Sequence, residues 1–459
     1  MTQTMTIEKP AQTKRPLPPV LPAPRWMGWT KELTDDVLGL LTLGRETGDF
    51  VRFRVANTYI YLANHPDYIK HILQDNNRNY GKATRALQII KLISGENIFT
   101  SEGEFWLKRR RLMQPTFHRQ HIASFGTVMT GAAQEMLAEW DAAPVNHVFN
   151  IDEEMMRVTL KIVGRALFSV DLTSDTRTLG KAFSDSTEYM IFRIRHPFYP
   201  PMGFPTLRNR RAKATRRTLE NVIQRIIRER VASGKEPNDL LTLLLSMRDE
   251  ETGEGLTEEE LGREISTMVF AGHETTSNTL TWAWYLLSLH PEVESGLHQE
   301  IDKVLNGRVP TMDDVPNLVY TRQVIDESIR LYPPAWTFGR VALKSDELGG
   351  YRIPAGAQIL ISPYTMHRHP RYWENPDVFE PERFSPTQNE KRPRFVYLPF
   401  GGGPRLCIGQ PFALAEATLL LAAIAQRYSL RLVPNAKVIP FPQITLGVAE
   451  GMPMTLTPR

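Results

Sequence analysis

The chain has 459 residues, of which 55 are Lys or Arg and 51 are Asp or Glu, so its formal net charge is +4. This small basic excess does not require a nucleic acid partner, and we find no finger, RNA-binding or P-loop signature. A single cysteine excludes an internal disulfide and favours a reducing compartment.

The N-terminal segment is rich in proline and lacks the apolar run that a signal peptide or a membrane span requires. We expect residues 1–29 to form a poorly ordered arm. Residues 30–459 are then expected to form one soluble, cytoplasmic domain without a transmembrane anchor. Within it, residues 49–73 alternate apolar and polar side chains on both sides of Asn57, which predicts a β-hairpin followed by a short helix.

Helical periodicity dominates from residue 101 to about residue 261, with a proline-rich break at residues 196–205. The strongest helix prediction covers residues 258–290, where Thr257 and Glu260 form a capping box at the start and Pro291 ends the helix. This segment is apolar around much of its circumference, so we expect it to cross the interior.

Two further helices are predicted at residues 312–333 and 409–428, and strands are predicted at residues 351–361 and near the C-terminus. The fold class is therefore mainly α with a minor β region. A helix of more than 30 residues through one core argues against separate domains.

The one cysteine, Cys407, lies in the segment LPFGGGPRLCIGQPF, just before a predicted helix. Tight glycine turns and the positive end of a helix both stabilise a thiolate. One thiolate is too few ligands for zinc or an iron–sulfur cluster, but it suffices as the axial ligand of heme iron. For an isolated cysteine, a buried structural role would be the simpler interpretation.

The residues around the thiol resemble the FxxGxRxCxG signature of the cytochrome P450 family, with Phe400, Gly403, Arg405, Cys407 and Gly409 in the signature positions. This resemblance implies the P450 fold, with the long central helix over heme b (iron protoporphyrin IX). It also implies that the Cys407 sulfur holds the iron, in a loop that includes Gly401, and that Phe400 packs nearby.

A heme has two propionates, which need cations or hydrogen-bond donors. Trp106 and Arg110 are four residues apart, so both lie on one helix face and can donate to one anionic group. They match the family's WxxxR, and Arg340 and Arg405 resemble its other propionate-binding positions.

Glu327 and Arg330 lie one helical turn apart, a weak signal by itself. Together with Arg383 in the segment PERF they resemble the family's ExxR and PxRF elements. The resemblance implies a buried network of these three side chains that fixes the loop on the heme side.

In the long helix, Ala271 and Gly272 remove side-chain bulk, and Thr275 can return its hydroxyl to the carbonyl four residues back. Adjacent Glu274 makes a proton relay plausible, although a chance Glu-Thr pair would be a surface acid and a β-branched filler. The segment AGHETT resembles the family's oxygen-activating pattern, in which His273 is a spacer.

The resemblance implies a heme-thiolate monooxygenase that inserts one oxygen atom from O2 into its substrate. Electrons would come from NAD(P)H through a separate ferredoxin, flavodoxin or flavin reductase, and we expect a basic surface made by Lys108, Arg109, Arg111, Lys391, Arg392 and Arg394 to meet an acidic partner. We expect Lys108, Arg109 and Arg111 to lie on a solvated basic face of their helix, because only Arg110 is in register with Trp106. The alternatives are an H2O2-dependent peroxygenase, which the acid-Thr pair disfavours, and a non-catalytic heme sensor or carrier.

The segments that resemble the family's substrate pocket are mainly apolar, although most apolar residues of any protein are simply core. They contain Leu87, Ile90, Pro334, Ala335, Trp336, Thr445 and Leu446. These residues predict a small hydrophobic substrate such as a fatty acid or a terpenoid. The hairpin has Asn57 and Thr58 where long-chain acid hydroxylases carry an arginine, which weakens the case for a carboxylate.

Overall fold

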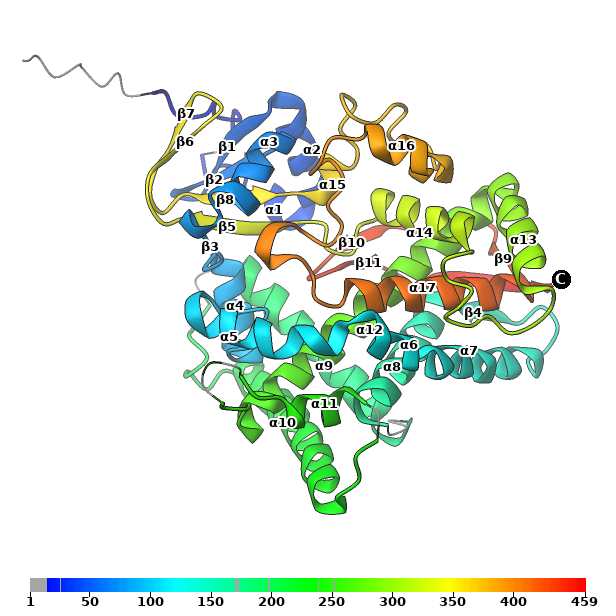
Figure 1. Cartoon of the computed structure of the whole chain (residues 1–459). Coiled ribbons are helices and arrows are strands. Elements are labelled where there is room, and N and C mark those ends of the chain that lie inside the picture. The colour runs from blue at the N-terminus through cyan, green and yellow to red at the C-terminus, as the bar shows by residue number, and fades with distance from the viewer. Residues whose placement is uncertain are drawn as a thin grey trace, which may run out of the picture.

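The computed structural model describes residues 15–24, 26–169, 173–196, 199–237, 239–249, 251 and 253–459. Most strands gather at one end of the molecule, and the others lie among the helices that build the rest, as Figure 1 shows. The described residues therefore form a mainly α structure with small sheets, as the sequence predicts.

The largest sheet has the strand order β1-β2-β8-β5-β3, with β1 at Phe50–Val55, β2 at Thr58–Ala63, β3 at Tyr80–Gly81, β5 at Phe338–Ala342 and β8 at Gln358–Ile361. The predicted hairpin is confirmed: β1 and β2 are antiparallel, Val55 pairs with Thr58, and α3 follows at Pro66–Lys70. Strand β8 joins β2 in parallel, which brings the N-terminal quarter against a segment 300 residues later.

Smaller sheets lie elsewhere in the chain. Their strands are β4 (Val148–Asn150), β12 (Pro453–Pro458) and β9 (Tyr428–Leu432) in one sheet, β10 (Pro440–Pro442) with β11 (Leu446–Val448), and β6 (Asp346–Leu348) with β7 (Tyr351–Ile353). The strand prediction for residues 351–361 thus corresponds to two separate strands, β7 and β8, with a turn between them.

Of the helices before the long central helix, the first two lie beside the largest sheet, and most of the later ones lie around the central helix (Figure 1). They are α1 (Glu32–Asp35), α2 (Val37–Thr47), α4 (Arg85–Ser94), α5 (Gly103–Met113), α6 (Arg119–Ser124), α7 (Gly126–Asp141), α8 (Ile151–Phe168), α9 (Thr173–Arg195), α10 (Leu207–Ser233) and α11 (Leu240–Ser246). The predicted break at residues 196–205 falls between α9 and α10, and its residues 197–198 lie outside the described residues.

The central helix α12 runs from Glu258 to Leu289, 32 residues. Both halves of its predicted capping box are present, since Thr257 accepts from the backbone N–H of Glu260 and the Glu260 carboxylate accepts from the backbone of Thr257. The helices after it are α13 (Pro291–Leu305), α14 (Val319–Leu331), α15 (Pro363–Met366), α16 (Pro386–Lys391) and α17 (Gln410–Ala425). Helix α14 is shorter than predicted because residues 312–317 form turns and the helix begins only at Val319.

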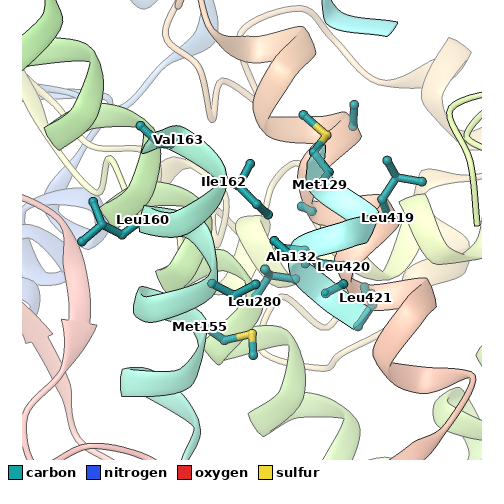
Figure 2. Packing of buried hydrophobic residues seen from close by; sticks show 14 of the residues in the cluster. Met129, Ala132, Met155, Leu160, Ile162, Val163, Leu280, Leu419, Leu420 and Leu421 are labelled. Atoms are coloured by element: carbon teal, nitrogen blue, oxygen red, sulfur yellow. The ribbon is translucent and has the colours of Figure 1, made fainter. Parts of the chain in front are cut away.

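The main core lies where α7, α8, α12 and α17 meet. Figure 2 shows buried side chains of all four helices in one cluster, among them Ala132 of α7, Leu280 of α12 and Leu420 of α17, with Met155 and Ile162 of α8 beside them. Helix α17 is buried on nearly every side, so α12 and α17 hold the site described below on two internal, close-packed helices.

The expectation of a poorly ordered arm up to residue 29 is wrong for its second half. The backbone of Leu21 donates to the carbonyl of Arg52 in β1, and Leu21 and Trp29 are buried beside Phe53. These apolar side chains extend the domain toward the N-terminus, because their burial offsets the entropy of ordering the segment.

Candidate functional site

A cavity of about 1070 Å³ lies between the large sheet, α4, α9, α12 and α17. This volume is at the upper limit of ordinary ligand pockets. The cavity is lined by Cys407 and Phe400 on one wall and by Ala271, Gly272 and Thr275 of α12 on another. The sequence elements that carry the predicted chemistry therefore meet in one place.

Cys407 lies three residues before Gln410, the first residue of α17, and its side chain is open to the cavity. The loop is closed behind it by a hydrogen bond from the Cys407 N–H to the carbonyl of Phe400, 3.1 Å. Burial raises the pKa of the Cys407 thiol, whereas the backbone N–H groups of Gly409 and Gln410 and the charge of Arg110 act in the opposite direction. A cation bound to the sulfur would complete the stabilisation of a thiolate.

Glycine is required at two positions of this loop. Gly401 and Gly403 have φ angles of 76° and 65°, in the left-handed region. At Gly403 a Cβ would also collide with the carbonyl oxygen of Leu73, 1.9 Å away. The glycines thus give the loop a tight path beside the cavity that other residues cannot adopt.

A group of cationic side chains lies beside the cysteine loop and lines the cavity. The guanidinium of Arg405 lies over the Trp106 ring, 3.7 Å from its centroid, and Arg340 is buried nearby. Burial lowers the pKa of Arg340 to about 10, and burial together with the charge of Arg340 lowers the pKa of Arg405 to about 10. Arg110 donates to the carbonyl of Leu406, 2.9 Å, and also lines the cavity.

Lys82 is a further member of this group that the sequence analysis missed. It lines the cavity, and burial together with the charges of Arg340 and Arg405 holds its pKa well below the ordinary value. No Asp or Glu of the described residues lines the cavity. The Glu102 carboxylate, which does not line the cavity, favours the charged forms of Lys82, Arg340 and Arg405. Because the cations outnumber this acid, the site is suited to a further group with more than one negative charge.

Thr275 donates its hydroxyl to the carbonyl of Ala271, 2.7 Å, as its spacing predicts. Glu274 does not line the cavity; its Oε1 accepts from the Thr445 hydroxyl, 2.6 Å, and its other oxygen has no partner among the described residues. Burial, and to a smaller extent the Asp152 carboxylate, raises the pKa of Glu274 to about 7. His273 is buried beside Phe183 and also lies outside the cavity lining.

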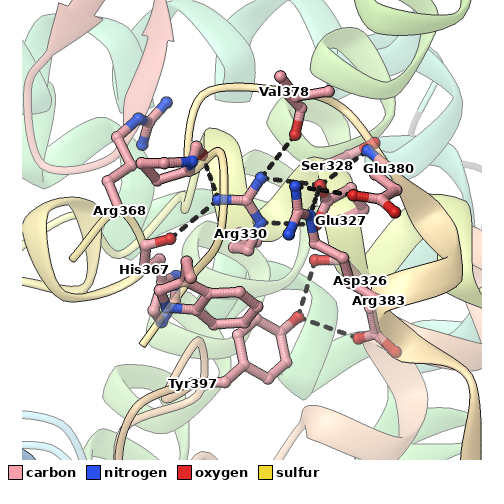
Figure 3. A network of polar contacts seen from close by, with 12 residues as sticks. Asp326, Glu327, Ser328, Arg330, His367, Arg368, Val378, Glu380, Arg383 and Tyr397 are labelled. Atoms are coloured by element: carbon pink, nitrogen blue, oxygen red, sulfur yellow. Dashed lines mark hydrogen bonds and ion pairs between the residues drawn. The ribbon is translucent and has the colours of Figure 1, made fainter. Parts of the chain in front are cut away.

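The predicted buried network is present (Figure 3). Arg330 binds both oxygens of Glu327, at 2.6 and 2.7 Å, and both side chains are 0% exposed. Arg383 lies 3.5 Å from the same carboxylate. The remaining Arg330 donors reach backbone carbonyls of the segment that precedes the cysteine loop, at His367, Pro376 and Val378.

Comparison with known proteins agrees with this geometry. The sequence profile described as Cytochrome P450 matches residues 18–451. The chain belongs to the cytochrome P450 family.

Two curated relatives and one solved structure show how close the similarity is. Cyclooctatin synthase of Streptomyces melanosporofaciens is 37% identical over 417 residues, 90% of this chain and 89% of the relative. Pentalenene oxygenase of Streptomyces avermitilis is 33% identical over 412 residues, 90% and 91% of the two chains. The crystal structure of the cytochrome P450DA heme domain superposes with a TM-score of 0.89 at 27% identity, over 97% of this chain and 98% of that one.

The chain is therefore a cytochrome P450 monooxygenase, and its family implies a heme-thiolate cofactor. The residues present fit that group. The one thiol of the chain is open to the cavity, the glycine loop leaves space against the main chain, and the cations described above match a group with two carboxylates.

Most predicted cavity residues line it in the P450 structure. They are Leu87, Ile90, Trp106, Arg110, Ala271, Gly272, Thr275, Pro334, Ala335, Trp336, Arg340, Phe400, Gly401, Arg405, Cys407 and Gly409. The prediction for Thr445 and Leu446 is wrong. Thr445 turns to Glu274 and Asn278, and Leu446 lies in the core at the start of β11, so Pro442, Gln443 and Ile444 take the pocket positions instead.

The prediction of a solvated basic face on α5 is wrong for Arg109. This side chain is 2% exposed and binds Glu264, 2.5 Å, and Glu260, 3.0 Å, on α12. Successive side chains of a helix point in different directions, so Lys108, Arg109 and Arg110 lie on different faces of α5. Helix α12 covers the face that carries Arg109.

Among the other residues predicted to form the docking surface, several are already paired with acids or packed on aromatic rings. Lys108 pairs with Glu254 at 2.6 Å, and Arg111 pairs with Glu251 at 2.5 Å. Arg392 is half-buried over the rings of Trp373 and Phe384. Lys391 and Arg394 are exposed.

None of the described helices is long and apolar enough to cross a membrane.

Proposed function

We propose that this P450 hydroxylates a hydrophobic terpenoid with O2, using heme b bound through Cys407 and electrons from a separate NAD(P)H-driven ferredoxin, flavodoxin or flavin reductase. We further propose that residues 30–459, together with the preceding segment around Leu21 that packs on β1, work as one domain in the cytoplasm. The observation that carries the proposal is that the open thiol and the Ala271–Thr275 segment line one largely apolar cavity. The relatives named for cyclooctatin and pentalenene support terpenoid chemistry.

The protein residues would have distinct tasks. Trp106, Arg110, Arg340 and Arg405 would hold the propionates, and Phe400 would pack beside the thiolate ligand. The bound heme supplies the activation of O2 and the insertion of one oxygen atom into a C–H bond.

On the other wall, Ala271 and Gly272 leave room for a small ligand above the heme side of the cavity. The Thr275 hydroxyl would orient water toward that space. Glu274, outside the cavity but next to Thr275 and near half-protonation at neutral pH, would exchange protons with that water.

A turnover assay with heme-loaded protein tests this function. With a surrogate ferredoxin, its reductase and NADPH, we expect O2-dependent hydroxylation of a terpenoid drawn from a library by the shift of the heme band on binding. Hydrogen peroxide alone should give little product. Product from peroxide but not from NADPH would indicate the peroxygenase, and no product with a normal substrate-induced shift would indicate a sensor or carrier.

Glu274 predicts a pH dependence of stability. The pKa of Glu274 is about 7 in the folded state and 4.5 in the unfolded state, so between these pH values the folded state binds a proton that the unfolded state has lost. The free energy of unfolding therefore decreases as pH rises from 4.5 through 7. Glu274→Gln should therefore gain stability relative to the parent above pH 7, by up to about 3 kcal/mol. Urea unfolding at pH 5 and pH 8 measures the difference, with Glu259→Gln on the exposed face of α12 as control. Equal gains at both pH values would contradict it.

A specific observation favours a second substrate class, a fatty acid. Arg85 at the start of α4 and Arg195 at the end of α9 both line the cavity, and neither has an ion-pair partner among the described residues. The hairpin lacks an arginine at Asn57 and Thr58, yet the fold brings two arginines, one exposed and one partly buried, to the lining of the same cavity from other elements. Such groups suit a terminal carboxylate.

Substitution of both arginines separates the two substrate classes. If the substrate is a fatty acid, Arg85→Leu and Arg195→Leu should weaken its binding about tenfold each, because a charge-assisted hydrogen bond is lost. Binding of a neutral terpenoid should change less than about twofold. Titration of the heme band measures both, and Arg217→Leu on the exposed side of α10 is the matched control. Unchanged fatty acid binding in both variants would exclude an anchoring role.

A further inference from the structure

The segment between α4 and α5, residues 95–101, contributes Ile98 and Phe99 to the cavity wall. It is a compact loop built around Asn97, whose buried side chain donates to the carbonyl of Gly95 and accepts from backbone N–H groups further along the segment. Four backbone N–H groups bond inside the segment, those of Asn97, Phe99, Thr100 and Ser101. The segment therefore keeps its own shape, and its contacts with other elements decide where it lies.

The N–H of Ile98 bonds outside the segment. It donates to both carboxylate oxygens of Glu264 on α12, at 3.0 and 2.9 Å. At the end of the segment, Arg405 donates to the carbonyl of Ser101 at 2.9 Å. Ile98 and its neighbour Phe99 are thus placed in the wall by a carboxylate that does not itself line the cavity.

Glu264 is held by Arg109 of α5, and both side chains are buried. The Arg109 guanidinium also binds Glu260 at 3.0 Å and lies 4.1 Å from the centroid of the Phe105 ring. A buried ion pair generally stabilises a fold no more than apolar residues of similar volume do. What apolar residues could not supply here is an acceptor for the Ile98 N–H, because a buried N–H without an acceptor is costly.

We propose that Arg109 and Glu264 set the position of Ile98 and Phe99 in the cavity wall and thereby orient a bulky hydrophobic ligand in this P450. Neither side chain of the pair lines the cavity, so both are positioning residues. Arg109 fixes the carboxylate, and the carboxylate fixes the loop. For a ligand that is turned over, the inference rests on the proposed hydroxylation, whereas the position of the wall does not depend on it.

The double variant Arg109→Met with Glu264→Leu tests the position of the wall. It removes both charges together and leaves apolar side chains of similar volume, so the protein should fold with a urea midpoint close to that of the parent. The Ile98 N–H loses its acceptor, and hydrogen exchange of a peptide covering residues 95–101 should become at least about tenfold faster by mass spectrometry. Parent-like exchange in the folded double variant would overturn the proposal.

A milder variant decides the matter if the double variant does not fold. Glu264→Gln keeps one acceptor oxygen for the Ile98 N–H but loses the charge, so its exchange rate should lie between those of the parent and of a loop without this bond, about threefold above the parent. Exchange identical to that of the parent would count against the role of the ion pair.

Two azoles of different size test the effect on ligands in the heme-loaded protein. Imidazole fills only the space at the iron, whereas the three aromatic rings of clotrimazole extend to the cavity wall. Titration of the heme band should show clotrimazole binding about tenfold more weakly in the double variant, or about threefold in Glu264→Gln, with imidazole changed less than about twofold. Unchanged clotrimazole binding, or an equal loss for both azoles, would contradict an effect on the wall.

Arg228→Met is the matched control, because it breaks an exposed pair at 2.9 Å between α10 and Glu258 at the start of α12, outside the cavity lining. It should leave exchange of the segment and both azole affinities unchanged. In turnover, a displaced wall should change the ratio of hydroxylated positions, whereas a loss of folded protein would lower all products equally. If the parent forms no product at all, the proposed function fails, while exchange and azole binding still decide the role of Arg109 and Glu264.

Discussion

Cys407→Ala is expected to abolish monooxygenase activity and the thiolate character of the heme. The chain has no other cysteine, so no second thiol can replace the lost ligand. Heme bound through sulfur shows a characteristic red-shifted band once it is reduced and exposed to carbon monoxide, because the thiolate donates electron density to the iron. The variant should lack that band even if some heme remains between the cations of Arg340 and Arg405.

The measurement compares the carbon monoxide difference spectrum and the heme content of parent, Cys407→Ala and Cys407→Ser. The serine variant keeps the size of the side chain and separates loss of sulfur ligation from a change in packing. A parent-like band or parent-like turnover in Cys407→Ala would remove the basis of the whole interpretation of the cavity.

Glu327→Ala is expected to cost about 3 to 5 kcal/mol of stability, because removal of one partner leaves the buried charge of Arg330 uncompensated. The loss extends beyond one ion pair. The Glu327 carboxylate also accepts from the backbone N–H of Glu380 and lies beside Arg383, so the segment before the cysteine loop loses its fixed position. Heme retention should therefore fall together with the unfolding midpoint.

The matched control is Glu220→Ala, which breaks an exposed pair with Arg216 at one-turn spacing on α10. That pair should contribute at most about 0.5 kcal/mol. Urea unfolding of the two variants side by side gives the comparison. A loss in Glu327→Ala no larger than in Glu220→Ala would show that the network does not stabilise this part of the fold.

Local patterns in the sequence were sufficient for several elements. Alternation around Asn57 predicted the hairpin, and Thr257 with Glu260 predicted the start of α12 to the residue. These features depend on neighbours within a few positions, where backbone hydrogen bonding and side-chain periodicity decide the conformation. The four-residue spacing of Trp106 and Arg110 similarly placed both on the cavity wall.

The site contained features that no local pattern shows. Lys82 and Arg85 lie just before and at the start of α4, whereas Arg195 lies at the end of α9, more than 100 residues later, and only their common cavity reveals them as a group. Thr445 was predicted to face substrate, but the position of Glu274 on α12 offers its hydroxyl a buried acceptor. A buried carboxyl needs a donor, and this requirement determines the direction of Thr445.

The sequence by itself determined that this chain has a P450 cysteine loop, a long internal helix and a mainly α fold, because those signals lie in contiguous residues with strict spacing. Only the tertiary structure decided which of two adjacent arginines, Arg109 and Arg110, is buried in an ion pair and which lines the cavity. One is buried against Glu264 and the other reaches the cavity. Helical spacing fixes the angle between two side chains, whereas the elements packed around the helix fix which side chain loses its water and must find a partner.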